Sequence, residues 1–399
     1  MSTTTAPLHV AIVSETYPPE VNGVAMTLGR MVQGLLARGH RVSLTRPRQH
    51  ALDTPLASAQ HSTTLVRGLP IPGYAGLRFG LPAPRLLRRQ WRADRPDVVQ
   101  VVTEGPLGAS AIAAARALGI PVVSEFHTNF HAYSRHYGFG WLESLVAAHL
   151  RRLHNRGRMT LVPCHQLGVD LVRRGYRGIR VVARGVDTLL FNPARRSTAL
   201  RATWNAGDSD LVVAHIGRLA PEKNLPLVLA TFAAIRRYAP SARLVLVGDG
   251  PSRRQLEQQH PGHIFAGMRH GEDLAAHYAS ADLFLFPSVT ETYGNVTLEA
   301  LASGLPVVAY RMAAAAELIR HGDNGMLADP GAGDQFVRAA LDFVTRPGAR
   351  RRAAAAAPLS VAALDWERIH EQLLAALREA IARPAVPAAN ESIYRFLPD

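Results

Sequence analysis

Short apolar runs rich in β-branched residues alternate with amphipathic stretches along this chain, and the alternation occurs twice. Such runs are typical of buried parallel strands, and the stretches between them are typical of covering helices. The strands expected in the first half are His9–Glu15, Arg41–Arg46, Val98–Glu104, Pro121–His127, Met159–Cys164 and Ile179–Arg184. Those expected in the second half are Leu211–Gly217, Arg243–Gly248, Ile264–Gly267, Leu283–Pro287 and Pro306–Tyr310. The pattern predicts an α/β protein with two parallel, Rossmann-like domains.

Helical patterns between the strands complete the two domains. They cover Val24–Arg38, Leu107–Leu118, Trp141–Arg156, Leu225–Tyr238, Leu274–Ser280, Asn295–Ala302, Gln335–Thr345, Arg350–Ala356 and Asp365–Ala382. Because Arg184–Arg196 fits neither half and contains glycine and proline, we place the linker there. We expect an N-terminal domain over 1–188, a C-terminal domain over 189–365, and a helix and tail over 366–399 that pack toward the N-terminal domain. Ligands of doubly wound sheets bind at the carboxyl ends of the strands, so two facing domains would enclose one deep site.

The composition excludes several classes of protein. The single cysteine, Cys164, excludes a disulfide scaffold and a cysteine-based zinc site. Met1–Pro7 lacks the basic region of a signal peptide. No apolar stretch of about 18 residues is free of glycine, proline or arginine, so we expect no membrane-spanning helix. A reducing cytoplasm is the expected location.

The formal charge of +14 is distributed unevenly. Residues 1–200 hold 25 arginines against 10 acidic residues, whereas residues 201–399 hold 20 basic against 21 acidic residues. The excess of positive charge therefore lies in the first half, where it favours anionic partners such as phosphates, nucleic acid or an acidic membrane. No nucleic-acid-binding motif or basic–aromatic platform is present, so we expect no nucleic acid partner.

Two segments of the first half combine arginine with apolar residues and tryptophan. One holds Arg85, Arg88, Arg89, Arg92 and Arg95 with Leu86, Leu87 and Trp91; the other holds Arg151, Arg152, Arg156 and Arg158 after Trp141, Leu142, Leu145, Val146 and Leu150. Both patterns are typical of basic amphipathic helices that lie on an anionic bilayer. The alternative is a solvated helix whose apolar side packs into the core. The first interpretation places the protein peripherally on the inner face of the cytoplasmic membrane.

Candidate site residues of the first half follow predicted strands. Gly23, next to Asn22 at a helix start, would let backbone N–H groups approach a phosphate closely. The glycine-rich dinucleotide fingerprint does not follow the first strand, which argues against NAD or FAD. His127 ends a strand, where such sheets place functional residues. His131 and His136 follow it, but no carboxylate shares their spacing, so we predict no metal site.

Two cations lie at a strand-to-helix turn of the second half. Arg218 follows the strand Leu211–Gly217, and Lys223, the only lysine, stands before the next helix. A bidentate guanidinium and an ammonium at a positive helix end suit a diphosphate. The nearby Asp208-Ser209-Asp210 resembles a metal-binding triplet, but its place before a strand favours a turn.

A second group of candidates lies in SVTETYGNVTLEAL, Ser288–Leu301. Glu291 falls in the loop at the mouth of a helix, and Glu299 about one turn inside it. Backbone N–H groups at the start of this helix are suited to an anion; they belong to Gly294, Asn295 and Val296. Two carboxylates beside an anion site could bind two sets of hydroxyl groups, although acidic residues near a helix N-terminus are also common for stability alone.

In combination, these motifs resemble the retaining glycosyltransferases of the GT-B fold, in family 4, over essentially the whole chain. Within the family, the motif sequences are most similar to those of bacterial GDP-mannose-dependent α-mannosyltransferases and of glucosyl- or sulfoquinovosyl-diacylglycerol synthases. The segments that carry this narrower similarity are Thr103–Gly108, Phe126–Phe130 and Arg184–Asp187. The resemblance implies a nucleotide-sugar donor and a lipid or glycolipid acceptor on an anionic membrane. It implies no metal and no other cofactor.

The resemblance also implies roles for the candidate residues. Gly23 would approach the donor diphosphate, which Arg218 and Lys223 would hold. Glu291 would bind hydroxyls of the transferred sugar, Glu299 the ribose, and His127 would lie by the sugar C6 hydroxyl. The turn at Met268 would contact the base. Front-face displacement, usually ascribed to this family, needs no carboxylate nucleophile.

Three points stay open in the sequence. Many relatives have a glycine pair where this chain has Asn22-Gly23, which leaves the path of that loop undetermined. The donor could be GDP-mannose or a UDP sugar (glucose, glucuronate or sulfoquinovose). A sugar-nucleotide epimerase on the same fold, or a non-catalytic binding protein, is an alternative of another class.

Overall fold

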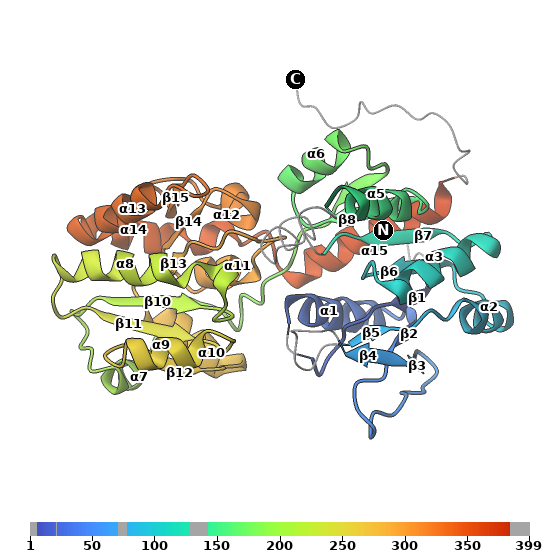
Figure 1. The fold of residues 1–399 in the computed structure, drawn as a ribbon, viewed down its shortest axis with the longest axis horizontal. Coiled ribbons are helices and arrows are strands. Elements are labelled where there is room, and N and C mark those ends of the chain that lie inside the picture. The colour runs from blue at the N-terminus through green and yellow to red at the C-terminus, as the bar shows by residue number, and fades with distance from the viewer. Residues whose placement is uncertain (1–5, 21, 71–77, 128–142, 384–399) are drawn as a thin grey trace. The chain divides into compact units, whose positions relative to one another are not determined.

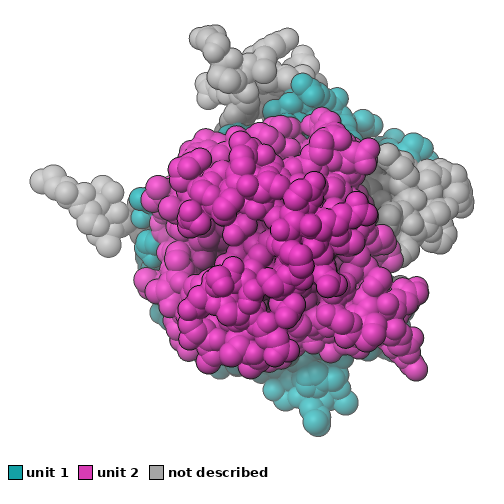
Figure 2. Space-filling view, turned by 90° about the vertical axis from the view of Figure 1, so that its left-hand side faces the viewer, with its two compact units in different colours: residues 1–183, 366–399 teal, residues 184–365 magenta. Residues whose placement is uncertain are grey.

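The computed structural model describes residues 6–20, 22–70, 78–127 and 143–383 (Figure 1). The chain divides into two compact units, coloured separately in Figure 2. Unit 1 comprises Met1–Ala183 and Trp366–Asp399, and unit 2 comprises Arg184–Asp365. Unit 2 thus begins inside the predicted linker, and the C-terminal helix is grouped with unit 1.

Among the described residues of unit 1, seven parallel strands form one sheet in the order β3-β2-β1-β6-β7-β8-β9. These strands are β1 (His9–Val13), β2 (Arg41–Pro47), β3 (His61–Val66), β6 (Val98–Val101), β7 (Val122–Glu125), β8 (Met159–Val162) and β9 (Ile179–Val181). The strand order reverses between β1 and β6, which makes their carboxyl ends the topological switch point of the sheet. A small antiparallel pair, β4 (Gly68–Pro70) and β5 (Arg78–Gly80), lies apart from this sheet.

The helices of unit 1 connect these strands and cover the sheet (Figure 1). They include α1 (Gly23–Ala37), α2 (Pro84–Ala93), α3 (Pro106–Ala117), α5 (Glu143–His154), α6 (His165–Arg173) and the C-terminal α15 (Trp366–Ala382). Helix α15 packs on α1, where Arg38 pairs with Glu367 and the His370 ring fills the space beside Gly34. Arg158 donates to the carbonyl groups of Ala380, Ile381 and Arg383, which closes the C-terminal end of α15.

Unit 2, every residue of which is described, has a parallel sheet in the order β12-β11-β10-β13-β14-β15. Its strands are β10 (Val212–Ile216), β11 (Arg243–Val247), β12 (Ile264–Gly267), β13 (Leu283–Phe286), β14 (Val307–Tyr310) and β15 (Gly325–Ala328). Its helices are α7 (Thr198–Thr203), α8 (Leu225–Arg236), α9 (Arg253–Gln259), α10 (Gly271–Ser280), α11 (Asn295–Ala302), α12 (Ala313–Leu318), α13 (Gly333–Thr345) and α14 (Pro347–Ala356). Helices lie on both sides of this sheet (Figure 1), and its switch point is between β10 and β13.

Each sheet is the centre of its own apolar core, as expected of strands covered on both faces. In unit 1, Val99 and Val101 pack with Leu107 of α3 and with Leu87 and Trp91 of α2. In unit 2, the strands pack with Phe232 of α8 and with Phe336 and Phe343 of α13. The prediction of two parallel α/β domains is confirmed.

The predicted strands are mostly too long at their carboxyl ends. The first strand stops at Val13 rather than Glu15, and β6 stops at Val101 rather than Glu104. The residues beyond these ends belong to loops that hold polar side chains. Strands β3 and β15 were missed because HSTTLV is polar and GMLA is short. Among the described residues, no helix combines the length and apolar character needed to cross a membrane.

Candidate active site

The most distinctive polar cluster of unit 2 lies at its switch point. The loops that follow β10 and β13 leave neighbouring strands in the sheet and lead to different helices. A crevice between such diverging loops is the usual ligand site of an open α/β sheet. The two loops carry four of the candidate residues predicted in this half, Arg218, Lys223, Glu291 and Gly294, and α11 carries Asn295, Val296 and Glu299.

The loop after β10 presents the two predicted cations. Arg218 lies 3.7 Å from Glu222, whose own carboxylate is 3% exposed. A short 3-10 turn, Pro221–Lys223, brings Lys223 to the end of the loop, and Asn224 takes a left-handed conformation (φ +53°) before α8 begins. Because a buried carboxylate needs a cationic partner, Glu222 anchors the guanidinium of Arg218 in this loop.

Lys223 reaches across to the loop after β13. Its Nζ forms an ion pair with Glu291 Oε1, and the hydroxyl of Ser288 donates to the same oxygen at 2.6 Å. The ammonium also lies 5.4 Å from the centre of the Phe286 ring, within the range of a cation–π contact. Lys223 and Glu291 are each about one-seventh exposed, at 15% and 13%. Residues 68 positions apart thus form one cluster at the surface of the crevice.

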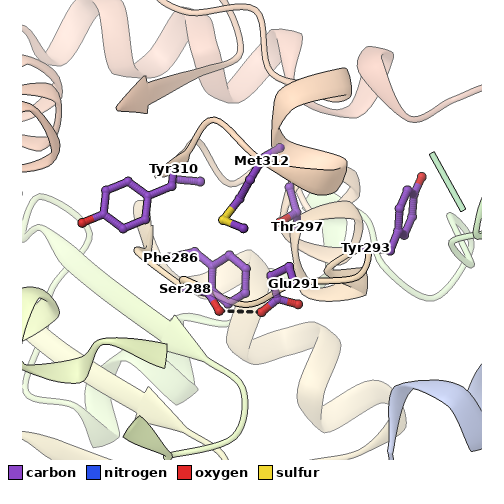
Figure 3. A pocket seen from close by; sticks show the side chains of 9 residues that line it. Phe286, Ser288, Glu291, Tyr293, Thr297, Tyr310 and Met312 are labelled. Carbon is purple, nitrogen blue, oxygen red and sulfur yellow. Dashed lines mark hydrogen bonds between the residues drawn. The ribbon is translucent and has the colours of Figure 1, made fainter. Parts of the chain in front are cut away.

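A small cavity lies directly behind Glu291. Figure 3 shows Phe286, Ser288 and Glu291 on one side of it and Thr297 and Met312 on the other. Its volume is about 10 Å³, the space of about one water molecule. A sugar ring cannot enter this cavity, so any sugar that Glu291 binds must approach its opposite, crevice side.

His215 lies beneath the cluster and carries no charge at neutral pH. It is fully buried in β10, and its ring lies next to the rings of Phe284 and Phe286. Burial, together with the nearby Lys223 ammonium, lowers the pKa of His215 to about 4. His215 therefore adds no charge beneath the Lys223–Glu291 pair.

Helix α11 points its N-terminus at the same crevice. Its N-cap residue is Gly294, which takes a left-handed conformation (φ +91°) and has no side chain that could cap the helix. Asn295 and Val296 are the first two residues of the helix, and Glu291 lies in the loop just before it. A helix start of this kind presents backbone N–H groups and a positive dipole end to an anion.

Glu299 lies one turn inside α11 and is separated from the Lys223 cluster. Its Oε2 accepts a hydrogen bond from the hydroxyl of the buried Tyr278 at 2.9 Å. Desolvation raises the pKa of Glu299 to about 7, and the Tyr278 hydroxyl opposes this shift. Met268, 48% exposed, follows Gly267 at the end of β12, where Gly267 has φ +75°.

In unit 1 the two predicted site residues occupy strand ends and helix starts. Gly23 is exposed as the first residue of α1, and Asn22 caps that helix by accepting from the Ala25 N–H at 2.8 Å. His127 follows β7, is 8% exposed, and places Nε2 2.6 Å from Glu125 Oε2. His131 and His136 lie outside the described residues.

The predicted bilayer contact of α2 is wrong in its apolar part. Leu87 and Trp91 are 0% and 4% exposed and belong to the core of unit 1, so neither can enter a membrane. The arginines lie together on the other side of the helix, at an open surface; they are Arg85, Arg88, Arg89 and Arg92. In the second segment Leu145 is 65% exposed, whereas Leu150 is buried and Arg158 closes α15. Trp141 and Leu142 lie outside the described residues.

A metal has no evident site in the part of the chain that the structure describes. No group of three or more histidine, cysteine, aspartate or glutamate side chains there could hold a metal ion. Asp210 accepts from the Gly207 N–H at 2.8 Å, which is the turn geometry expected for the Asp208–Asp210 triplet.

Sequence reasoning missed four residues that support the candidates. Ser288 lies inside the quoted segment Ser288–Leu301 and Glu222 directly precedes Lys223, but nothing in their spacing shows that they contact Glu291 and Arg218. Tyr278 carries no local signal, since its contact with Glu299 joins two helices. Glu125 could have been found, because a carboxylate inside an apolar strand requires a partner.

Comparisons with known proteins agree with this arrangement. Residues 21–189 match the family model described as Glycosyltransferase Family 4, and residues 210–346 match the model described as Glycosyl transferases group 1. A GDP-mannose-dependent alpha-mannosyltransferase of Mycobacterium tuberculosis is 33% identical over 389 residues, covering 96% of this chain and 99% of the relative. A sulfoquinovosyl transferase of Arabidopsis thaliana is 35% identical over 275 residues, covering 66% of this chain and 53% of the relative. The solved sucrose-phosphate synthase of Thermosynechococcus elongatus has a TM-score of 0.76 at 19% identity and covers 94% of this chain and 99% of its own, which shows a shared fold.

Proposed function

The chain belongs to glycosyltransferase family 4, and from that premise we propose that it transfers mannose from GDP-mannose to a membrane lipid or glycolipid. The observation that carries the proposal is the cluster of Arg218, Lys223 and Glu291 beside the glycine-capped start of α11. The choice of donor follows the mycobacterial relative, whose name states a GDP-mannose donor and which aligns over almost its whole length.

Unit 2 would bind the nucleotide diphosphate. Lys223 and Arg218 offer an ammonium and a guanidinium within one loop, and α11 adds a positive helix end. Lys223 is paired with Glu291. Donor phosphate would share the ammonium, so that Lys223 joins the phosphate to the carboxylate that binds the sugar. Gly23, exposed at the start of α1, would allow close approach of the same diphosphate.

The remaining candidates would bind hydroxyl groups and the base. Glu291 faces the crevice with one oxygen already held by Ser288, so its position is fixed before the sugar arrives. Glu299, held by Tyr278, would bind the ribose, and Met268 would contact the base. His127 would contact the transferred sugar at its C6 hydroxyl.

The reaction would retain the configuration of the sugar and need no metal. The bond between the sugar C1 and the phosphate oxygen breaks, and a bond from C1 to the acceptor oxygen forms on the same face. The proton of the acceptor hydroxyl passes to an oxygen of the leaving diphosphate. The charge that develops on this leaving group is stabilised by Arg218, Lys223 and the start of α11, which is the role a metal ion has in other transferases.

Membrane binding would be electrostatic and would use the arginine side of α2. Four arginines on one side of the helix favour anionic lipid headgroups, and the burial of Trp91 leaves no apolar wedge on this helix. Binding of this kind weakens with salt, because surface charges are screened. The protein would thus act on the inner face of the cytoplasmic membrane.

A donor-by-acceptor screen with native lipid extract tests the proposal. We expect mannosylated lipid with GDP-mannose, detected by mass spectrometry, and tighter binding of GDP than UDP in titrations. Equal and weak binding of both nucleotides would contradict the donor-site assignment.

A UDP-sugar-dependent diacylglycerol glycosyltransferase is the second candidate, favoured by the similarity to the sulfoquinovosyl transferase. It predicts tighter binding of UDP and transfer of glucose, glucuronate or sulfoquinovose. A sugar-nucleotide epimerase would instead form product in the absence of any acceptor, so omission of the lipid extract separates it from both transferases.

A further inference from the structure

Two polar side chains interrupt the most buried strands of unit 1. Gln100 in β6 is 0% exposed, and Glu125 at the end of β7 is 1% exposed. The other residues of β6 are valines, and those of β7 are two valines and a serine. A polar group, and a carboxylate above all, is costly in such a position unless partners compensate for the lost water.

Gln100 and His127 are two partners of Glu125. Strands β6 and β7 are neighbours in the sheet, and Gln100 Nε2 donates to Glu125 Oε1. The second oxygen, Oε2, lies 2.6 Å from His127 Nε2, within hydrogen-bond distance. Each oxygen of the buried carboxylate is thus held by a donor, one from the adjacent strand and one from the imidazole.

This contact determines the state of the His127 ring. When Glu125 is ionised, its carboxylate can only accept a hydrogen bond, so in that state Nε2 of His127 is the protonated donor. Carboxylate partners set the tautomer and ring orientation of functional histidines in the same way. Gln100 supports the carboxylate in turn, and its own Oε1 is buried without a partner among the described residues. The amide is therefore oriented by its bond to Glu125 alone.

We propose that Glu125 is a positioning residue for His127, and that Gln100 positions Glu125. The inference rests on the proposed function, in which His127 contacts the transferred sugar. Glu125 itself does not touch substrate: it keeps Nε2 protonated and holds the ring in one orientation. Its loss slows transfer, whereas the nucleotide, which unit 2 binds, keeps its affinity.

Three variants and one matched control test this chain of contacts. Glu125→Leu removes both hydrogen bonds, Glu125→Gln keeps a neutral acceptor of similar shape, and Gln100→Leu removes only the support. The control is Ser124→Ala, in the same strand, where the 2% exposed hydroxyl contacts His154 Nδ1 at 2.8 Å instead of His127. We expect kcat to fall about 10- to 100-fold in Glu125→Leu, and less in the other two variants, with nucleotide affinity unchanged. Ser124→Ala should keep the kcat of the wild type.

A double mutant separates positioning from a general loss of structure. If Glu125 acts through His127, then Glu125→Leu lowers kcat no further once His127→Ala is present. Additive losses in the double mutant would overturn the proposal. Thermal unfolding shows which variants fold. If Glu125→Leu does not fold, Glu125→Gln replaces it in the double mutant.

Imidazole nitrogen NMR provides a readout that does not depend on activity. The signals of His127, identified by their loss in His127→Asn, should show one state with Nε2 protonated in the wild type and a mixture of states in Glu125→Leu. An unchanged imidazole in Glu125→Leu would overturn the proposal. If the wild type transfers no hexose, the proposed function fails, and the NMR experiment still decides whether Glu125 sets the state of His127.

Discussion

In unit 2 the loops at the switch point bring cations and a glycine-capped helix to the crevice, through Lys223, Arg218 and α11. In unit 1 the loop after β1 supplies side chains that cap two helices, α1 and the α3 that follows β6. Asn22 caps α1, and Glu15 Oε1 accepts from the Leu107 N–H at 3.2 Å in the first turn of α3. At the same topological position, one unit therefore presents two cations and a glycine-capped helix start, whereas in the other unit side chains of the chain itself accept from helix N–H groups.

The net charges of the two units run opposite to this local arrangement. Unit 1 holds 26 basic and 14 acidic side chains, and unit 2 holds 19 and 17. The unit with the larger positive charge has a carboxylate at its switch point, and its surplus arginines lie on surfaces such as that of α2. The two units thus share a sheet topology with a switch point but differ in the side chains of their loops, and this local difference does not follow net charge.

The largest expected effect removes the anion site of unit 2. Lys223→Ala should lower kcat by about 100- to 1000-fold, because the charge of the leaving diphosphate loses its ammonium. Transfer to lipid is followed by mass spectrometry, with the exposed Arg320→Ala as the control substitution in the same unit. Unchanged turnover in Lys223→Ala would show that the crevice is not the donor site.

The surface charge of unit 1 should control membrane binding. Two reversals on α2, Arg89→Glu with Arg92→Glu, remove attraction of about 1 kcal/mol per arginine, so vesicle binding should fall by about 30-fold or more. Co-sedimentation with anionic vesicles measures the effect. The matched control reverses Arg236 and Arg237, which are exposed at the end of α8 in unit 2. Equal losses in both pairs would mean that net charge, rather than α2, determines binding.

Each unit has a carboxyl group with a raised pKa, but only the one in unit 2 should affect the affinity for the donor. Desolvation raises the pKa values of Glu15 and Glu299 to about 7. Ribose hydroxyls bind the ionised form best, so donor affinity should rise about 10-fold from pH 6 to pH 8 as Glu299 loses its proton. A nucleotide sugar is the suitable probe, since its diphosphate charge is constant over this range.

Glu299→Gln should abolish this pH dependence, whereas Glu15→Gln should leave it intact. Calorimetric titrations of each variant at both pH values make the comparison. If Glu15→Gln flattens the profile and Glu299→Gln does not, the assignment of the ribose site to unit 2 is wrong.

The smallest expected effect concerns backbone strain in unit 2. Among the described residues, the non-glycine positions with positive φ are Asn205, Asn224 and Ala313, all in this unit. Ala313, at φ +49°, has no side chain that could stabilise this conformation. Ala313→Gly should therefore stabilise the protein by about 1 kcal/mol in denaturant titrations. Ala314→Gly, one residue further into α12, should destabilise it by a similar amount.

Much of the arrangement could be predicted where the signal is local. The helix Asn295–Ala302 was predicted to the residue, because a glycine cap stands directly before an apolar periodic stretch. The positions of Glu291 and Glu299 relative to this helix followed from spacing alone. The burial of Trp91 in the core could not be predicted in this way, because the apolar side of a helix has the same sequence pattern whether a core or a bilayer covers it.

The sequence by itself determined two parallel α/β units and the strand-to-helix turns that carry the candidate residues. Both depend on hydrophobic periodicity and helix-start residues within about ten positions of each other. Only the tertiary structure decided which turns meet. Lys223 and Glu291 pair across 68 positions, and Glu15 reaches Leu107 across 92, because strand order makes β10 adjacent to β13 and β1 adjacent to β6. No local pattern encodes that order, so the charge of each crevice appears only when the sheet has formed.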